Sequence, residues 1–570
     1  MTTTQLADQE ARRRIREDLE TNFVVEAAAG TGKTTALVER IVAVLKGGSN
    51  LREIIAVTFT DPASGELKLR LRKKIEDERQ NPGCDPEIKT RLEDSLRQIE
   101  EARIGTIHAF CADLLRERPV ESGIDPLFEV APDERARSLF DRAFDRWFEA
   151  RLDSPGEGVR RILRRKAGED GPRGLLRSAA WELSNRRDFP AAWIRNAEFD
   201  RRSEIDSLMN EMDSLGEWSA SGEQDDYFTK SLMEIKKFVD DVRRTESITG
   251  GRDYDGLEPR IADLVKSRNR YWNWTGFRRT RSGFPKEELI RRRDQLKARI
   301  EQFRDASGAD LAPLLRDELW PVVEAYEHLK KRAGCLDFLD LLLRARNLIR
   351  DDGIVRNDYQ KRFSHLFVDE FQDTDPLQAE ILMLIASDDP VETAWRKVKP
   401  KRGKLFIVGD PKQSIYRFRR ADVLLYESVK ERVTSSGGER LDLNVSFRAV
   451  PAIQEAVNSA FSLSMNGASS TQARYVPLSP SRSGSGGQPP IVALPVPAPY
   501  GDYGKIVEWR IEESLPEAIG AFVDWMINSS DWTVTERERP HERVRIAAHH
   551  ICLLFRRFRS FNTDVTRPYV

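Results

Sequence analysis

Short apolar runs at four places in the chain predict buried β-strands, at residues 23–25, 54–57, 366–368 and 405–408. Between the first two runs, apolar residues recur every three or four positions, as on the buried face of a helix: Leu37, Ile41, Val44 and Leu45. A strand, a helix and a second strand form a βαβ unit, so we expect a parallel sheet in an α/β fold. The last two runs each end in an acidic turn. Because ligands of such sheets bind at the carboxyl ends of the strands, those turns are predicted to lie at a binding site.

The long stretch between residues 130 and 345 has a different, helical pattern. Apolar and aromatic residues recur at three- and four-residue spacing over 139–148, and residues 311–345 show a similar pattern. We interpret the stretch as a helical insertion within the α/β domain. Farther on, residues 466–490 are rich in Ser, Gly and Pro and predict a flexible surface segment. Two apolar runs after it, 491–494 and 551–555, predict strands of a second α/β unit.

The composition is that of a highly charged chain with several domains. Its 570 residues exceed what one hydrophobic core accommodates, 33% of them are charged, and no apolar run reaches membrane-spanning length. The N-terminus lacks the apolar region of a signal peptide. Four cysteines without metal-ligand spacing suggest a reducing compartment: Cys84, Cys111, Cys335 and Cys552. We therefore predict a cytoplasmic protein with no membrane partner.

Net charge gives no indication of a nucleic-acid partner, because 93 Lys and Arg balance 94 Asp and Glu. Any nucleic-acid binding must then come from local patches. Basic clusters do occur, at 160–161 and 291–293 among others. Taken one at a time, each is more simply interpreted as the solvated face of a helix. The run 268–274 interleaves basic and aromatic residues, which fits either contact with duplex DNA or a packed helical core.

A glycine-rich turn joins the first predicted strand to the helix that follows, and it carries the signature of a phosphate-binding loop. Gly30 and Gly32 allow backbone N–H groups to close around phosphate oxygens, and the helix N-terminus adds partial positive charge. Lys33 is expected to reach the β- and γ-phosphates of ATP, and the Thr34 hydroxyl to hold Mg²⁺. The residues predicted to contact the nucleotide are Ala27, Ala28, Ala29, Gly30, Thr31, Gly32, Lys33, Thr34 and Thr35.

The turn after the third strand offers two adjacent carboxylates, Asp369 and Glu370. Asp369 is a hard oxygen ligand suited to Mg²⁺, and Glu370 is predicted to orient and deprotonate the water that attacks the γ-phosphate. After the fourth strand, Gln413 is placed to lie near the γ-phosphate as a neutral sensor. Aromatic rings and guanidinium groups then alternate, which is typical of single-strand binding with bases stacked on the rings: Tyr416, Arg417, Phe418 and Arg419.

Together these motifs resemble those of superfamily 1 DNA helicases of the UvrD/Rep type, nearest the RecB/AddA branch. In that family the loop has the form Ala-x-x-Gly-x-Gly-Lys-Thr, which accounts for Ala27 in place of the more general glycine. The resemblance covers most of residues 5–130 and 336–455, and the stretch between them matches only in being helical. The matching motifs are residues 27–34, 56–60, 104–111, 369–374, 409–419 and 441–448.

The resemblance implies roles that the pattern alone does not assign. Arg448 is expected to reach the γ-phosphate and to form the catalytic set with Lys33, Glu370 and Gln413. Gln9 stands where the family places a glutamine that reads adenine. The residues expected to line the DNA strand are Thr58, Phe59, Thr106, His108, Tyr416, Phe418 and Arg419.

The expected architecture is a RecA-like phosphate-loop domain in two parts, 1–110 and 345–438, which carries a mainly helical insertion at 111–344. Residues 439–570 are expected to begin a second RecA-like domain that includes the flexible segment. By resemblance, the chain is an ATP hydrolase, an ATP-dependent 3′-to-5′ DNA helicase and translocase of recombination or repair. Expected partners are single-stranded DNA, single/double-strand junctions, and a nuclease or second helicase subunit.

The sequence departs from the family pattern in its last part. Residues 439–570 contain neither Thr-x-His-x-x-Lys-Gly nor the late Thr-Arg-Ala motif of the second RecA-like domain, nor a nuclease signature. We therefore expect that domain to be incomplete within this chain. One absent motif carries a further arginine for the γ-phosphate, so the alternative function is a non-hydrolysing ATP- and DNA-binding module. A metabolic phosphate-loop enzyme, indifferent to DNA, is the third candidate.

Overall fold

The protein divides into two compact units in the computed structural model. Unit 1 comprises Met1–Gly105, Gln360–Ala379 and Ala386–Val570, and unit 2 comprises Thr106–Tyr359 and Glu380–Ile385. Among the helices of the described residues, none is both long and apolar enough to cross a bilayer. The described residues are 6–165, 171–189, 191–266, 268–276, 284–467, 472–484, 487–494, 508–536, 542–560, 563–564 and 566.

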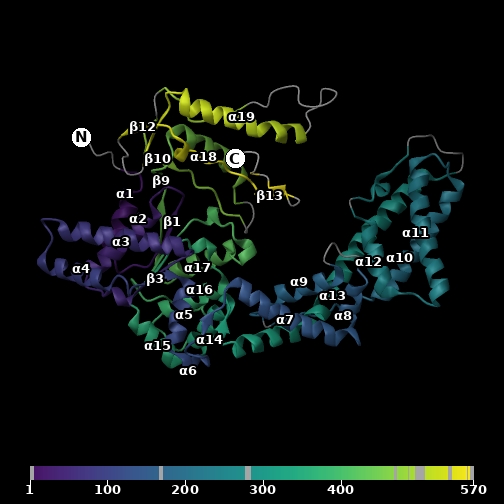
Figure 1. Ribbon diagram of the computed structural model, residues 1–570, viewed down its shortest axis with the longest axis horizontal. Helices are drawn as coiled ribbons and strands as arrows, with labels where there is room; N and C mark the ends of the chain where they lie inside the picture. The colour runs from purple at the N-terminus through teal and green to yellow at the C-terminus, as the bar shows by residue number, and fades with distance from the viewer. Residues whose placement is uncertain are drawn as a thin grey trace. The chain divides into compact units, whose positions relative to one another are not determined.

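A six-stranded sheet organises unit 1, and the first four strands predicted from apolar runs, at 23–25, 54–57, 366–368 and 405–408, are confirmed within it (Figure 1). In spatial order the sheet contains β3 (Arg103–Thr106), β2 (Ile54–Thr58), β6 (His365–Val368), β7 (Leu405–Gly409), β1 (Phe23–Ala27) and β8 (Glu439–Leu443). β1 runs parallel to β7 and β8, and β6 runs parallel to β2 and β7. The carboxyl ends of these parallel strands therefore meet at one edge, as the sequence predicts.

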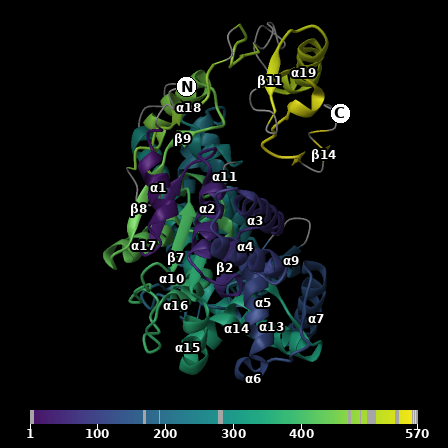
Figure 2. The ribbon, with the colours of Figure 1, turned by 90° about the vertical axis from the view of Figure 1, so that its left-hand side faces the viewer.

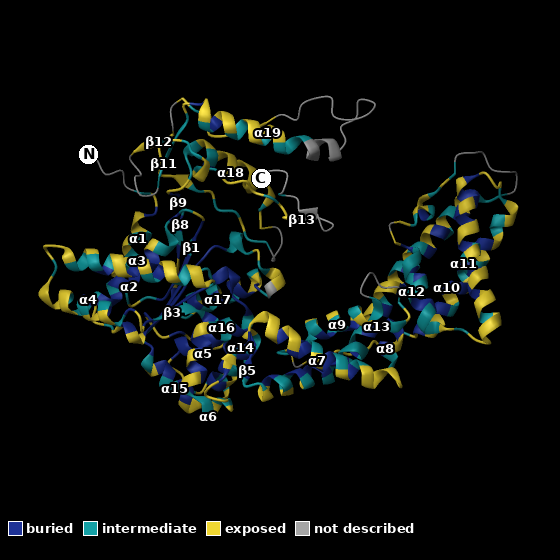
Figure 3. Ribbon diagram, viewed as in Figure 1, coloured by how far each residue is buried: buried dark blue, intermediate teal, exposed yellow. Residues whose placement is uncertain are grey.

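The sheet is buried because its strands carry few polar side chains. Most of β1 is dark blue in Figure 3, and one residue each of β1, β2 and β7 has no exposed surface: Phe23, Ile55 and Val408. Helix α2 (Lys33–Lys46) packs against β7 through a buried stripe that includes Ile41, so this predicted helix is also confirmed. Burying one such aliphatic side chain contributes about 1.5–3 kcal/mol, and the resulting core holds the loop before α2 in place.

Helices α1 (Gln9–Glu17) and α3 (Asp61–Gln80) lie on either side of α2 in the packing, and α1 also contacts β8 (Figure 2). α17 (Val423–Ser435) packs on β1 and β8. Two further helices each have residues in both units, α15 (Gly353–Arg362) and α16 (Pro376–Ala386). Unit 1 also contains α4 (Pro86–Gln98) and α18 (Pro451–Ser464).

The strand β8 closes one edge of this sheet. Leu443 of β8 is in register with Ala27 of β1. The domain boundary that we expected between residues 438 and 439 therefore falls inside the first sheet, and β8 does not begin a separate one. As a result, the segment that follows β8 emerges at the same edge as the phosphate loop.

Beyond β8 the structure corrects two strand predictions. Residues 491–494 and 551–555 form no strand, and Leu554 is almost fully exposed. An apolar run becomes a strand only where a neighbouring strand pairs with it, and within the described residues neither run has such a neighbour. Of the segment predicted to be flexible, 468–471 and 485–486 lie outside the described residues. The elements found here are β9 (Val445–Ser446), β10 (Ser479–Pro480), α19 (Glu508–Asn528), β11 (Thr533–Thr535), β12 (Arg543–Arg545), β13 (Arg559–Ser560) and β14 (Thr563–Asp564).

Unit 2 is predominantly helical, with one very long helix, α13 (Lys286–Arg332). The first half of α13 packs in one apolar cluster with α10–α12, and its second half packs in another with α7 and α9 (Figures 1 and 3). The remaining elements of unit 2 are α5 (Ile107–Glu117), α6 (Pro119–Ser122), β4 (Glu129–Val130), α7 (Asp133–Leu152), α8 (Glu157–Leu163), α9 (Gly171–Ser184), α10 (Arg201–Gly216), α11 (Tyr227–Thr249), α12 (Tyr254–Leu264), β5 (Cys335–Leu336) and α14 (Phe338–Asp351).

Two features of unit 2 settle alternatives left open by the sequence. Trp272 is buried in the core and its indole N–H donates to the Leu264 carbonyl (2.6 Å), so the core interpretation holds for this tryptophan of the 268–274 run. Arg161, expected on a solvated face, is fully buried. Its guanidinium donates to the carboxylates of Glu258 (2.7 Å) and Asp310 (2.7 Å), because a buried charge is tolerated only with such partners.

Candidate active site

The turn between β1 and α2 has the backbone of a phosphate-binding loop. Gly30 (φ +79°) and Gly32 (φ +88°) adopt left-handed conformations that glycine accommodates without strain. The Thr31 hydroxyl is buried and donates to the Ala28 carbonyl (2.8 Å), which fixes the turn from inside. α2 begins at Lys33, so its unpaired first-turn N–H groups face the loop. Among the other predicted contact residues, Ala27 is buried, whereas Ala29 and Thr35 are exposed.

Lys33 and Glu370 meet at the carboxyl edge of the sheet. The Lys33 Nζ lies 2.6 Å from Glu370 Oε2, and both side chains are largely shielded from solvent. Glu370 has a left-handed backbone (φ +51°), a conformation that a non-glycine residue adopts at a cost of about 1–3 kcal/mol. Such local strain concentrates at functional sites. Two residues expected to act on the γ-phosphate are thus held within direct contact, although they are 337 residues apart.

Two carboxylates next to this pair, Asp369 and Asp373, are destabilised in their charged form. Burial and the neighbouring Glu370 raise the pKa of Asp369 to about 6, and the same two causes raise the pKa of Asp373 to about 6. Among the described residues, no group donates a hydrogen bond to Asp373 Oδ1, which is buried. Buried carboxylates without enough donors favour a bound cation, so the donor set fits Mg²⁺. The half-buried hydroxyl-bearing residue Thr34 follows Lys33 on α2.

A chain of hydrogen bonds leads from Glu370 to Gln413. The side-chain Nε2 of Gln372 donates to Glu370 Oε2 (2.8 Å). The side-chain Oε1 of Gln372 accepts the Asp410 backbone N–H (2.8 Å). The Gln413 amide in turn donates to Asp410 Oδ2 (2.7 Å). Gln372 and Asp410 were given no role in the sequence analysis. Their only signal was a position inside two motifs whose neighbours carry the chemistry.

Three aromatic rings form a stepped row, Phe59 from the turn after β2 and Tyr416 and Phe418 from the segment after β7. The Phe59 and Tyr416 ring centroids are 4.8 Å apart, and those of Tyr416 and Phe418 are 5.7 Å apart. Phe418 is 74% exposed, so most of its side chain is accessible to a stacking base. Thr58, by contrast, is buried and donates its hydroxyl to the Thr60 carbonyl. The side chain of Arg419, also predicted here, lies outside the described residues.

Thr106 and His108 belong to unit 2 and have local partners there. The Thr106 hydroxyl oxygen caps α5 by accepting the Ala109 N–H (3.3 Å). The His108 ring packs edge-on against Phe338, with centroids 5.5 Å apart. Their predicted contact with DNA stays a prediction, and each side chain also stabilises the start of a helix or its packing.

The segment after β8 lies directly on the phosphate loop. The Phe447 backbone N–H donates to the Gly30 carbonyl (2.8 Å), and a Cβ atom added to Gly30 would come within 2.6 Å of Arg448 Cβ. The exposed side chain of Arg448 is thus attached next to the loop that is predicted to hold phosphate. Gln9, expected to read adenine, is exposed at the first turn of α1.

Two residues near Gln9, neither of them predicted from the sequence, contact the phosphate loop and the segment after β8. Asp8 and Arg12 form an ion pair (2.8 Å) at the start of α1. Their only sequence signal is a spacing of four residues, which is common in helices without any function.

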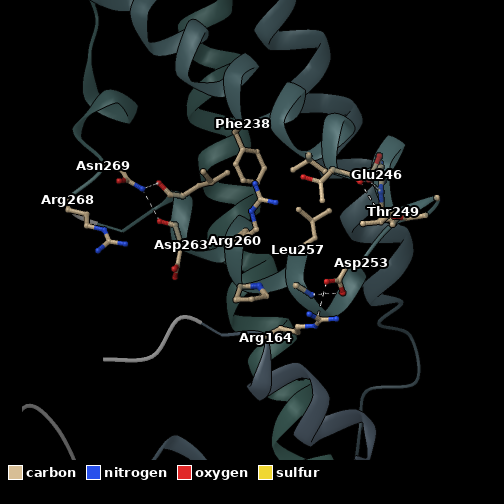
Figure 4. Close-up of a pocket in the computed structure, with 18 residues that line it drawn as sticks. Arg164, Phe238, Glu246, Thr249, Asp253, Leu257, Arg260, Asp263, Arg268 and Asn269 are labelled. Carbon is tan, nitrogen blue, oxygen red and sulfur yellow. Dashed lines mark hydrogen bonds and ion pairs between the residues drawn. The ribbon is translucent and has the colours of Figure 1, made fainter. Parts of the chain in front are cut away.

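Unit 2 contains a separate hollow of about 940 Å³, lined by α11, α12 and the turn after them. Figure 4 shows Arg260 beside Phe238 and Arg164 beside Asp253. The cations of this rim are largely paired with acids of the same unit, as for Arg252 with Glu246. None of the residues predicted for the nucleotide or the DNA strand lines it.

A strand, a glycine-rich turn and a helix at the carboxyl edge of a parallel sheet, with a lysine and a carboxylate converging there, define a phosphate-loop nucleotide-binding protein. The UvrD/REP helicase N-terminal domain matches residues 7–434. The chain therefore belongs to the UvrD/REP helicase family, as its motifs indicated.

The chain is also similar to proteins that are each named as one subunit of an ATP-dependent helicase/nuclease. It is 26% identical over 494 residues to that of Pediococcus pentosaceus, which covers 78% of this chain and 38% of the relative. The protein of Listeria welshimeri is 27% identical (77% and 38%), and that of Bacillus velezensis is 27% identical (78% and 38%). The chain spans little more than a third of the length of these relatives.

Proposed function

We propose that this chain couples ATP hydrolysis to 3′-to-5′ movement along single-stranded DNA, as the helicase motor of a recombination or repair enzyme. UvrD-family helicases use ATP, and this chain belongs to that family. The observation that carries the proposal is the 2.6 Å contact between Lys33 and Glu370. It brings together a cation that binds phosphate and a carboxylate that can activate water.

In this proposal the two residues exchange partners when ATP binds. Lys33 turns from Glu370 to the β- and γ-phosphates, whose charge attracts it more strongly than one carboxylate does. Glu370 is then free to orient the attacking water and to accept its proton. The Gln372 amide, which already donates to Glu370, keeps that carboxylate aimed. Arg448 approaches the γ-phosphate from the segment after β8.

Asp369 and Thr34 are the residues that would hold Mg²⁺. The ion would neutralise charge on the β- and γ-phosphates, and it would also compensate the buried Asp369 carboxylate. The raised pKa of Asp369 supports this assignment. The buried Asp373 Oδ1, which accepts no hydrogen bond among the described residues, also supports it.

Single-stranded DNA is proposed to bind over Phe59, Tyr416 and Phe418. Each base stacked on an aromatic ring is worth about 1–3 kcal/mol and demands no particular sequence. The hydrogen bonds from Glu370 through Gln372 and Asp410 to Gln413 lead toward this row in the chain. They offer a route by which loss of the γ-phosphate changes the grip on DNA.

DNA-stimulated ATP hydrolysis by the purified chain tests the proposal. We expect turnover that rises with single-stranded DNA and disappears in Lys33→Ala. The alternative, a non-hydrolysing ATP- and DNA-binding module, predicts tight ATP binding and DNA binding without turnover. Hydrolysis that is indifferent to DNA would instead support a metabolic phosphate-loop enzyme. Strand displacement on duplexes with a 3′ or a 5′ overhang tests the polarity.

The relatives' name describes one subunit of a helicase/nuclease, which supports a multi-subunit assembly. We propose that this motor works at single/double-strand junctions in the cytoplasm together with a nuclease or second helicase subunit. In the same proposal, the helices at 111–344 are an insertion into the first RecA-like domain, and the residues after β8 begin the second one. Co-purification with the product of a neighbouring gene would identify the partner.

A further inference from the structure

The buried carboxylate of Asp8 joins α1 to the segment that carries Arg448. The Asp8 side chain is 2% exposed. Its Oδ2 accepts the backbone N–H groups of Asn444 (3.2 Å), which links β8 to β9, and of Val445 (3.1 Å), the first residue of β9. A carboxylate that accepts two backbone donors is a strong, oriented anchor. These contacts fix the point from which the chain continues to Arg448.

Arg12 extends the same anchor to the phosphate loop. Its Nε and Nη2 each donate to the Asp8 carboxylate (2.8 Å), a two-pronged pair that fixes the guanidinium plane. The Nη2 group also donates to the Thr31 carbonyl (2.8 Å), inside the loop. The guanidinium carbon lies 5.1 Å from the centre of the Phe447 ring. One side chain thus touches both the loop and the residue before Arg448.

We propose that Asp8 and Arg12 are positioning residues that hold Arg448 at the γ-phosphate and make its position depend on the phosphate loop. This role rests on the proposed function. The loop and the 444–448 segment contact each other directly at Gly30, and Asp8 and Arg12 hold both from the side. A shift of the loop on phosphate binding therefore moves the Thr31 carbonyl, the Arg12 guanidinium and the backbone before Arg448 together.

A mutant cycle between Asp8 and Arg448 tests this role. A misplacement of about 1 Å at a catalytic group costs up to about 100-fold, so Asp8→Asn and Arg12→Gln are expected to lower kcat for ATP about 10- to 100-fold. KM for ATP is expected to change less than about threefold, because the phosphate loop keeps its own contacts. In an Arg448→Ala background, Asp8→Asn is expected to cost less than about twofold more, since residues acting as a unit are not additive.

A second readout is independent of hydrolysis. Arg448 is proposed to contact only the γ-phosphate, so Arg448→Ala and Asp8→Asn should each lower the ratio of affinities for ATPγS and ADP about tenfold. Arg13→Gln is the matched control. Arg13 lies on the same helix, but its partners are the exposed Glu10 and Glu17, so both readouts should stay at the wild-type value.

The possible outcomes separate this role from the proposed function. Additive losses in Asp8→Asn and Arg448→Ala, or an unchanged nucleotide ratio in Asp8→Asn, would overturn the positioning role while the helicase proposal stands. A wild-type chain that binds neither nucleotide would refute both. Thermal unfolding of each variant reports folding, and Arg12→Lys, which keeps the charge but loses the fork, is expected to behave like Arg12→Gln.

Discussion

Asp369→Asn is expected to make unit 1 more stable at neutral pH, although the residue is predicted to bind Mg²⁺. Burial and the neighbouring Glu370 raise the pKa of Asp369 from 3.8 to about 6. A carboxyl whose pKa is raised by folding stabilises the fold below its unfolded pKa. That contribution is lost as the pH rises through the folded pKa. The ionised Asp369 of the nucleotide-free protein is thus a source of instability above about pH 6.

The size of the effect follows from the shift. A rise of about two pKa units, at about 1.4 kcal/mol per unit, corresponds to about 3 kcal/mol at a pH well above the folded value. Asparagine keeps the shape of the side chain and removes its charge. We therefore expect the free energy of unfolding of the variant to exceed that of the wild type by about 3 kcal/mol near pH 7.5, and the difference to fall toward zero near pH 4.

Urea unfolding of unit 1 is the assay, followed by hydrogen–deuterium exchange in peptides from β6 and β7. These peptides report opening of the sheet itself, because amide exchange reflects the local stability of the segment that contains each amide. The experiment is run without nucleotide at several pH values. A variant less stable than the wild type at neutral pH, or a gain that does not change with pH, would refute the reasoning.

Glu78→Gln provides a control of opposite sign in the same unit. Hydrogen bonds from Lys46 and Lys74 lower the pKa of Glu78, so its charge stabilises the fold at a pH above the unfolded pKa. That stability is lost as the pH falls through the folded pKa. The glutamine variant is therefore expected to lose stability at neutral pH and to approach the wild type in acid.

Three further substitutions test other parts of the molecule. Phe418→Ala should weaken binding of single-stranded DNA by about 1–3 kcal/mol in fluorescence anisotropy, with ATP affinity unchanged. Its neighbour Ile415, 71% exposed but unable to stack, is the matched control, and equal losses would contradict the stacking role. Glu370→Gln should lower the rate of ATP hydrolysis at least about 100-fold in a steady-state assay while a fluorescent ATP analogue still binds; a matching loss of affinity would argue against its role as base. Arg161→Met removes the fully buried cation that joins Glu258 to Asp310. These acids keep Arg201 and Arg195 as partners, so the variant should destabilise unit 2 by about 3 kcal/mol in thermal unfolding, the lower end of the cost of breaking a buried ion pair. Arg160→Met, at a half-exposed neighbour, should change little, and similar effects of the two would show that the buried network is not what matters.

The strands of the sheet could be predicted because a parallel strand buried on both faces leaves a continuous apolar run in the sequence. The edge strand β8 left no such run. Its first two residues, Glu439 and Arg440, are exposed, and only Leu441 and Leu443 are buried. The run 551–555 shows the converse failure, since its apolar residues pair with no strand in the part of the chain that the structure describes. The local sequence pattern therefore predicts which residues are buried better than it predicts which strands pair with each other.

In the candidate site, too, some residues could be predicted from the sequence and others could not. Lys33 and Glu370 could be anticipated because each follows a strand, and the ends of parallel strands meet at one edge. Asp8 could not, because its partners are backbone groups 436 and 437 residues away, and a backbone N–H leaves no trace in the sequence. The same holds for Gly30. Its sequence position explains the left-handed turn, but the contact with Arg448 depends on where β8 places the chain.

The central position of β1 also means that its two neighbouring strands are synthesised long after β1 itself. Phe23 of β1 pairs with Phe406 of β7 and with Glu439 of β8, so both neighbours are translated about 380 to 420 residues later, roughly 20–80 s at bacterial or eukaryotic elongation rates. During that interval the apolar first strand has no sheet to join, whereas the helices encoded between β3 and β6 already have their own partners. A nascent chain released before residue 405 lacks both neighbours of β1. Such a product would present an apolar, unpaired strand at its N-terminus, which makes early termination a hazard for aggregation as well as a loss of activity.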